Sequence, residues 1–151
     1  TIEVIRQQIA ETRSFALLDD LRYSVRGGRV PSWVKTVADL LHLKAIIATK
    51  PDGRISLSGF LFGRRNRAER FAKFIARRIG RGETIEVGIG HAVCEDDARL
   101  LAQQIRSLVS TSDDVVVNGL GPALGVHGGP GTLLVAVSPV VSLEGFARRP
   151  D

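Results

Sequence analysis

The spacing of apolar and polar residues along the chain predicts alternating helices and strands. Apolar residues recur at helical intervals in the first dozen residues and in residues 31–42 and 65–79. Capping and charge signals predict two further helices, at residues 19–26 and 95–109. Short apolar runs, or strict apolar–polar alternation, predict strands at residues 14–18, 44–49, 55–61, 85–89, 115–117 and 133–137. Together these elements predict an α/β (α+β layered) domain, in which one mixed β-sheet is packed with helices.

Local signals sharpen several of these elements. Asp19 is expected to cap the second helix, and Gly27-Gly28 to end it. Pro51-Asp52-Gly53 predicts a tight turn, so the strands on either side of it should form a hairpin. The continuous apolar runs at residues 115–117 and 133–137 are typical of inner strands. The third helix is expected to point Trp33, Val34, Val37, Leu40 and Leu41 inward, and the fourth Ala68, Phe71, Ala72, Ile75 and Ile79.

Composition is that of a single globular domain. The chain has 151 residues, of which 44% are hydrophobic and 25% charged. Its longest apolar stretch, residues 132–141, is interrupted by Ser138 and Pro139 and is too short to cross a bilayer. No charged and apolar leader opens the sequence, so we expect a cytoplasmic protein. Cys94 is the only cysteine, which excludes an internal disulfide and any multi-cysteine zinc site.

Charge is the next notable feature, because the net charge is +5 and arginine supplies 17 of the 21 basic residues. Eight cations fall in one helical segment, in which Glu69 is the single acid: Arg64, Arg65, Arg67, Arg70, Lys73, Arg77, Arg78 and Arg81. This Arg64–Arg81 helix could dock on nucleic acid or on an acidic protein. The alternative is a solvated helix face. Phe71 and Phe74 lie on or beside the apolar stripe, so we expect them in the core and not stacked on bases.

The densest candidate for chemistry is the glycine-rich segment at residues 119–131, which contains His127. Glycines allow a ligand to approach the backbone and expose N–H groups to an anion, and histidine adds a donor that titrates near neutral pH. The spacing fits neither the dinucleotide fingerprint nor the P-loop. The segment therefore predicts either a carboxylate- or phosphate-binding loop or a tight connection that requires glycine for structural reasons alone.

Two smaller motifs lie outside this segment. His91 and Cys94 offer only two metal ligands where zinc needs more, so no metal and no cofactor is expected. A hydrolase or transferase that uses Cys94 with His91 or His127 is a weaker alternative, because no third residue orients the pair. In the Arg26–Arg29 turn, Arg29 follows a glycine pair and is either a positioned anion contact or a plain surface arginine.

Taken in order, these motifs resemble a known family. The segments Leu21–Val30, Leu41–Ile47 and Asp52–Ile55 are followed by the arginine-rich helix, Gly90-His91-Ala92 and the acidic helix start at Glu95, and then by Gly121–Gly131. This order is similar to that of the C-terminal domain of DegV-family proteins, over nearly the whole chain. The resemblance implies a single domain over residues 1–151, with residues 1–13 as a linker helix and the N-terminal domain of the parent protein absent.

The resemblance also implies a function. DegV-family proteins are bacterial two-domain carriers that hold a long-chain fatty acid in a tunnel between the domains and present its carboxyl group to a fatty-acid kinase. This kinase partner would be a separate subunit or a kinase domain of the same parent chain. By this resemblance His127, with the N–H groups of Gly128, Gly129 and Gly131, would hold the carboxylate, and Arg29 would lie nearby. Arg29 and either Arg64 or Arg65 would face the kinase. The chain itself would then not be an enzyme, and nucleic acid would not be its partner; the alternative is the basic binding module described above.

Overall fold

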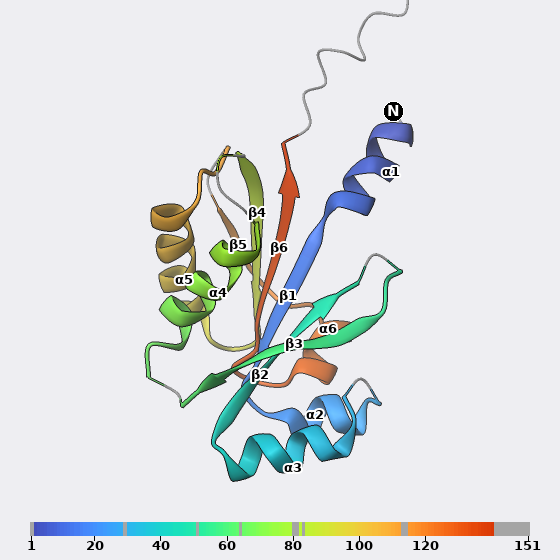
Figure 1. Cartoon of the computed structure of the whole chain (residues 1–151), viewed down its shortest axis with the longest axis vertical. Coiled ribbons are helices and arrows are strands. Elements are labelled where there is room, and N and C mark those ends of the chain that lie inside the picture. Colours follow the sequence, from blue (N-terminus) through green and yellow to red (C-terminus); the bar gives the residue numbers. More distant parts are fainter. Residues whose placement is uncertain are drawn as a thin grey trace, which may run out of the picture.

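The computed structural model describes residues 2–28, 30–50, 52–63, 65–79, 82, 84–112 and 115–140 (Figure 1). Arg29 and Arg64, to which the resemblance assigns roles, lie outside the described residues. The chain order of the elements is α1 (Ile2–Glu11), β1 (Arg13–Leu18), α2 (Leu21–Arg26), α3 (Ser32–Leu40), β2 (Leu43–Thr49), β3 (Ile55–Phe62), α4 (Arg67–Ile79), β4 (Ile85–His91), α5 (Glu95–Leu108), β5 (Val116–Gly119), α6 (Pro122–Gly128) and β6 (Leu133–Pro139).

The strands form one mixed sheet, as predicted, in the order β3-β2-β1-β6-β4-β5. Among the strands of the described residues, only β4 and β5 pair in parallel, and β2 and β3 form the predicted hairpin. β6 lies between β1 and β4, as expected of an inner strand. The prediction that residues 115–117 form an inner strand is wrong. β5 pairs only with β4 and occupies the sheet edge, so Val116 is 57% exposed despite its apolar neighbours.

Helices cover both faces of the sheet, and the alternation along β1 shows which residues serve each face. Phe15 and Leu17 belong to the larger core cluster, under α4 and α5. Ala16 and Leu18 belong to a second, smaller cluster with residues of α2 and α3. Figure 1 shows α4 and α5 on one side, with α2, α3 and α6 grouped around the other end of the sheet. No helix in the described part of the chain is long and apolar enough to cross a membrane.

The predicted apolar stripe of α4 is confirmed. Ala68, Phe71, Ala72 and Ile75 are all buried, and Ile79 packs against the same cluster. Phe74 meets the ring of Phe15 edge-on, with ring centres 6.2 Å apart. Both phenylalanines of α4 therefore serve the core, as the sequence predicted, and do not form a surface for stacking bases.

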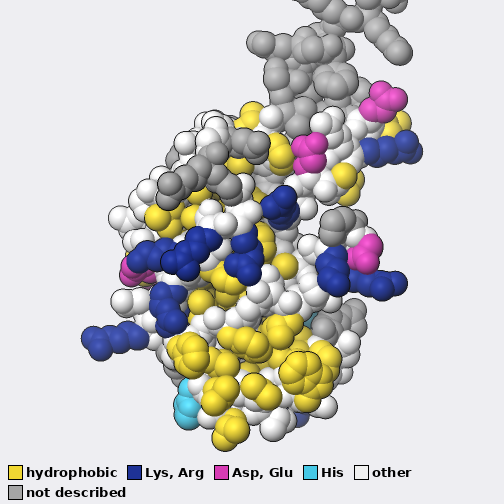
Figure 2. Space-filling view, viewed as in Figure 1, with side chains coloured by type: hydrophobic (Ala, Val, Ile, Leu, Met, Phe, Trp, Pro, Cys, Tyr) yellow, Lys and Arg dark blue, Asp and Glu magenta, His cyan; other side chains and the backbone are white. Residues whose placement is uncertain are grey.

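The predicted inward face of α3 is largely wrong. Of the five residues expected to point inward, only Val34 is buried, and Ala38 is the other buried residue of the helix. Trp33 is 61% exposed and Leu40 is 77% exposed. Because the helix contacts the sheet through the narrow face of Val34 and Ala38, its other apolar side chains remain on the surface. Figure 2 shows the resulting apolar patch over α3 and the adjacent end of β3.

The cap of α2 also differs from the prediction. Asp20, not Asp19, occupies the cap position, where its carboxylate accepts a hydrogen bond from the Arg22 N–H at 2.9 Å. The side-chain hydrogen bond from Arg22 lowers the pKa of Asp20. Asp19 is thereby left to point into the molecule, toward the turn that follows α6.

Candidate functional site: an apolar pocket that ends at His127

The glycine-rich segment folds as a short helix followed by a tight turn. Pro122 stands in the first turn of α6. This turn tolerates proline because its N–H groups have no carbonyl acceptor within the helix, so the N–H that proline lacks is not missed. The helix ends at Gly128 and is followed by the C-cap residue Gly129, whose φ of 75° belongs to the left-handed region that favours glycine. His127 consequently occupies the last turn of α6 and does not lie in an open loop.

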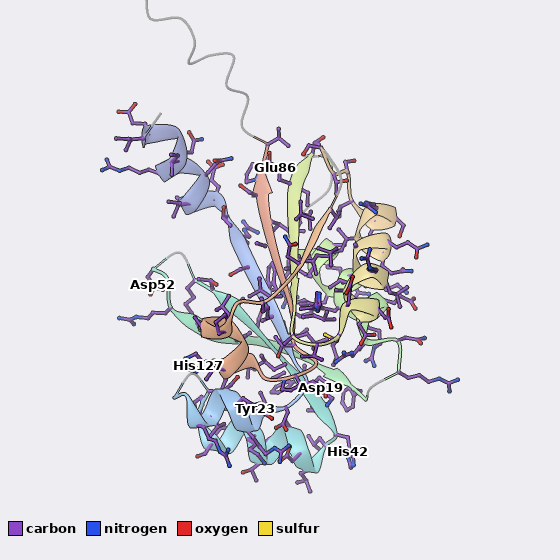
Figure 3. All side chains as sticks on the ribbon, turned by 180° about the vertical axis from the view of Figure 1, so that it is seen from behind. Asp19, Tyr23, His42, Asp52, Glu86 and His127 are labelled. Atoms are coloured by element: carbon purple, nitrogen blue, oxygen red, sulfur yellow. The ribbon has the colours of Figure 1, made fainter. Side chains whose placement is uncertain are left out.

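The imidazole of His127 is held against the end of α2. A Cβ atom placed on Gly27 would lie only 2.8 Å from its Cε1, so this close approach requires glycine. The buried hydroxyl of Ser24, one turn earlier, donates to the His127 carbonyl oxygen at 2.7 Å. Figure 3 shows His127 on α6 beside α2, which carries Tyr23. The first glycine of the Gly27-Gly28 pair therefore both ends a helix and makes room for the histidine.

The turn after His127 is equally constrained. A Cβ on Gly129 would lie 2.7 Å from Cγ of Tyr23, and a Cβ on Gly131 would lie 2.9 Å from Cβ of Asp19. The Gly129 N–H donates to the Gly125 carbonyl at 2.8 Å, and the Gly131 N–H donates to the Ala92 carbonyl at 2.7 Å. These two N–H groups are thus engaged within the fold, which corrects the expectation that they donate to a ligand. Their glycines serve the path of the turn.

Arg67 fastens this turn to the sheet. Its side chain is only 11% exposed, and its Nη1 donates to the Gly131 carbonyl at 2.9 Å and to Asp19 at 3.0 Å. The same guanidinium pairs with Asp97 at the start of α5. Burial alone would lower the pKa of Arg67, but the hydrogen bond and charge of Asp97, with the charge of Asp19, raise it. Lys44 completes the cluster through an ion pair of 3.1 Å with Asp19.

Sequence reasoning missed this cluster. The sequence pattern places Arg67 among the cations of the basic helix, because nothing in its neighbourhood distinguishes it from Arg65 or Arg70. Two carboxylates indicate the cluster in the sequence: Asp19 directly follows β1, and Asp97 stands in the first turn of α5, the helix that follows α4.

An apolar pocket of about 280 Å³ opens beside His127, between α6 and the sheet. Its floor consists of β1, β2 and β6, with Leu120 and Leu124 on the opposite wall. The lining contains no Lys, Arg, Asp or Glu among the described residues. Three polar side chains gather at the α6 end, namely Ser24, His127 and Thr132. The geometry suits a ligand with a long apolar part and a compact polar end.

Two buried polar atoms near that end have no hydrogen-bond partner among the described residues. They are Nδ1 of His127 and Oγ1 of Thr132. Most buried polar groups in proteins are paired. Because the Nδ1 side of the His127 ring packs against Gly27, the Thr132 hydroxyl is the unpaired group that is a candidate for ligand contact at the pocket. Gly128 lines the same pocket and is buried.

The basic helix is less available than its composition suggested. The guanidinium of Arg78 stacks over the ring of Phe74, with Cζ 3.6 Å from the ring centre, and donates to the Ser58 carbonyl at 3.0 Å. Arg70 donates to the Phe62 carbonyl, and Lys73 pairs with Glu69 at 2.5 Å. A band of basic side chains is visible over α4 in Figure 2, but several of its members have partners within the fold. Arg65, the described member of the predicted kinase contacts, is exposed in the turn before α4.

No hydrogen bond joins Cys94 to His91 in the described part of the chain. His91 ends β4, as predicted. The thiol of Cys94 is half-buried and donates to the Thr132 carbonyl at 3.4 Å, and no imidazole is among its described hydrogen-bond partners. Burial raises the pKa of this thiol, which keeps it protonated and weakly nucleophilic. The described residues contain no group of three or more His, Cys, Asp or Glu side chains that could hold a metal ion.

Comparisons with known proteins agree on one family. The family model described as "Uncharacterised protein, DegV family" matches residues 1–140. A DegV domain-containing protein from Clostridium perfringens is 31% identical over 139 residues, which is 90% of this chain and 47% of that protein. The chain spans about half the length of the curated relatives it matches.

Solved structures share the fold. A fatty acid binding DegV family protein from Streptococcus agalactiae matches with a TM-score of 0.75 and 22% identity, over 93% of this chain and 49% of that one. A DegV family protein from Eubacterium eligens, loaded with heptadecanoic acid, matches with a TM-score of 0.78 and 22% identity, over 91% of this chain and 49% of that one. At this level of identity the two matches establish the α/β architecture.

Proposed function

Because this chain belongs to the DegV family, we propose that it is half of a fatty-acid carrier, the half that supplies His127 to the acyl head group. The observation that carries the proposal is the position of His127. Its ring lies at the polar end of an apolar pocket and is fixed there by Gly27 and Ser24. The fatty acids bound by its structural neighbours match this arrangement, because each has a long apolar chain and one polar group.

Energetics assign different tasks to the two ends of the ligand. Each CH₂ group removed from water contributes about 0.8 kcal/mol, so the tail would supply most of the affinity. A carboxylate buried without donors would take up a proton, whereas each donor to it contributes roughly 1.5–3 kcal/mol. His127 would therefore fix the orientation of the acyl chain. Gly128, at the same end, would leave the head group room to approach.

The remaining wall of the tunnel would come from a second domain. The pocket is open, and the chain corresponds to about half of each relative. We propose that these residues form the C-terminal domain of a two-domain protein, with α1 as the linker that enters it. A groove formed by this domain alone would become an enclosed tunnel once the other half covers it.

The carrier would present its ligand to a kinase and would not itself catalyse the reaction. The kinase would transfer the γ-phosphoryl group of ATP to the acyl carboxylate, giving an acyl phosphate and ADP. Such a transfer needs positive charge near the carboxylate. Arg29, and Arg64 or Arg65, would provide contacts to the kinase close to that point, and the exposure of Arg65 is compatible with this role.

Native mass spectrometry of the protein expressed from its complete open reading frame tests the proposal. The expected result is a bound mass in the range of long-chain fatty acids, which is strongly reduced by His127→Ala and retained by Arg77→Ala. If the wild-type protein carries no acyl chain and takes up none from added palmitate, the proposed function is wrong. Arg65→Ala should slow acyl-phosphate formation by the kinase without changing the amount of fatty acid bound.

A further inference from the structure

Thr132 carries a polar group at the pocket that the proposed function has not used. The residue is only 2% exposed, and it lines the same pocket as His127. Its main chain is fixed on both sides. The Thr132 N–H donates to the Gly129 carbonyl at 3.3 Å, and its carbonyl accepts from the Ala92 N–H at 2.9 Å. The hydroxyl, by contrast, has no hydrogen-bond partner among the described residues.

The other hydroxyl groups of the pocket are already paired. Among the described residues, four with hydroxyl groups line it: Ser14, Ser24, Thr49 and Thr132. Ser14 and Thr49 bond to each other, at the end of the pocket formed by the start of β1 and the end of β2. Ser24 donates to the His127 carbonyl. Thr132 is therefore the hydroxyl left available at the end where His127 lies.

Gly128 keeps this hydroxyl accessible. A Cβ on Gly128 would lie 2.9 Å from Oγ1 of Thr132 and 3.0 Å from its Cγ2. A larger side chain at that position would cover the hydroxyl or displace it. A buried hydroxyl without a partner destabilises a fold, and valine has the same shape without that cost. The presence of threonine here points to a ligand that supplies the missing partner.

Resting on the proposed function, we propose that the Thr132 hydroxyl is a second donor to the acyl head group, beside His127. No charged side chain lines the described pocket, and the Arg67 guanidinium is engaged by Asp19, Asp97 and Gly131. Among the described residues, the head group is thus held from this half of the protein by one imidazole and one hydroxyl. The ligand class is a long-chain carboxylic acid, whose carboxyl oxygens accept both hydrogen bonds.

Calorimetric titration of palmitate into the protein expressed from its complete open reading frame tests this assignment. Thr132→Val should weaken palmitate binding about tenfold, the loss expected for one hydrogen bond to a charged acceptor, while Thr132→Ser restores binding to within about threefold. Thr36→Val removes a hydroxyl from the exposed face of α3, outside the pocket, and should leave the affinity unchanged. A merely structural hydroxyl would not give this pattern, because its loss would lower the melting temperature.

Melting of the ligand-free variants therefore provides the second measurement. Thr132→Val should melt at or above the temperature of the wild-type protein when no ligand is present. Two results would overturn the assignment: palmitate affinity unchanged in Thr132→Val, or a ligand-free melting temperature that falls in Thr132→Val and recovers in Thr132→Ser. If the wild-type protein itself does not bind palmitate, both the proposed function and this assignment are wrong. If the wild-type protein binds palmitate and Thr132→Val binds it with the same affinity, only the assignment is wrong.

Discussion

Gly27 and His127 lie in contact across a gap of 100 residues in the sequence, and the backbone of the first leaves no space for a side chain beside the ring of the second. The contact joins the end of α2 to the last turn of α6. It explains why a glycine is needed at a helix end whose φ of −79° any residue could adopt. The orientation of the histidine is thus set by a residue in a different part of the chain.

Gly27→Ala tests this relationship. The added methyl group would overlap the imidazole, so we expect the ring to move, fatty-acid affinity to fall about tenfold, and stability to fall by about 1–3 kcal/mol. Gly125→Ala is the matched control, because it lies in the same helix as His127 and a Cβ there meets no atom within 4 Å. Isothermal titration with palmitate and urea denaturation give the two quantities. Full affinity in Gly27→Ala would show that the contact does not position the ring.

Arg67 is expected to contribute stability through the turn after α6. Arg67→Ala removes the ion pairs to Asp19 and Asp97 and the bond to the Gly131 carbonyl, so the free energy of unfolding should fall by about 3 kcal/mol. Arg77→Ala, on the exposed face of the same helix, should change it by no more than about 0.5 kcal/mol. Equal effects of the two substitutions in urea denaturation would contradict the proposed role of the cluster.

The orientation of α3 makes a third prediction. Leu40 is 77% exposed and Val34 is 2% exposed, although the apolar pattern alone places both inward. Leu40→Ser should therefore change the unfolding free energy by less than about 0.5 kcal/mol, whereas Val34→Ala should lower it by about 1–3 kcal/mol. Thermal denaturation of the two variants provides the comparison. A large loss in Leu40→Ser would mean that its side chain is covered in the protein.

The fold could be predicted from the sequence where a residue pattern is compatible with only one local structure. The stripe of α4 and the β2–β3 hairpin belong to this class, because helical spacing and a proline–glycine turn leave few alternatives. α3 does not, since its apolar residues exceed what one face can bury. The position of β5 at the sheet edge could not be predicted either, because a run of valines indicates strand formation but not the number of neighbouring strands.

For the candidate site, the sequence indicated the residue but not its surroundings. A histidine among glycines is a local signal, and so His127 could be singled out. Its contact with Gly27, the ion-pair cluster of Arg67 and the hydrogen bond from the Gly131 N–H to the Ala92 carbonyl all join segments far apart in the chain. Those relationships exist only once the sheet has brought β1, α2 and α6 together.

The thiol of Cys94 offers a pH-dependent test of the local environment. Burial raises its pKa above that of an ordinary thiol, and only the thiolate reacts with iodoacetamide. The folded protein should therefore be labelled slowly at neutral pH, with a rate that rises only at a pH above that at which the urea-unfolded control reacts. Because the folded pKa is the higher one, the contribution of this thiol to stability is complete below the unfolded pKa and is lost as the pH rises through the folded pKa. Rapid labelling of the folded protein at neutral pH would contradict the described burial.

A crystal structure of the protein, expressed from its complete open reading frame and grown with palmitate, tests the central claim most directly. The expected density places the carboxyl group within hydrogen-bond distance of the His127 ring, with the acyl chain running along β1 and β2 past Leu124. A fatty acid bound in the opposite direction, or one that lies away from α6 altogether, would contradict the account.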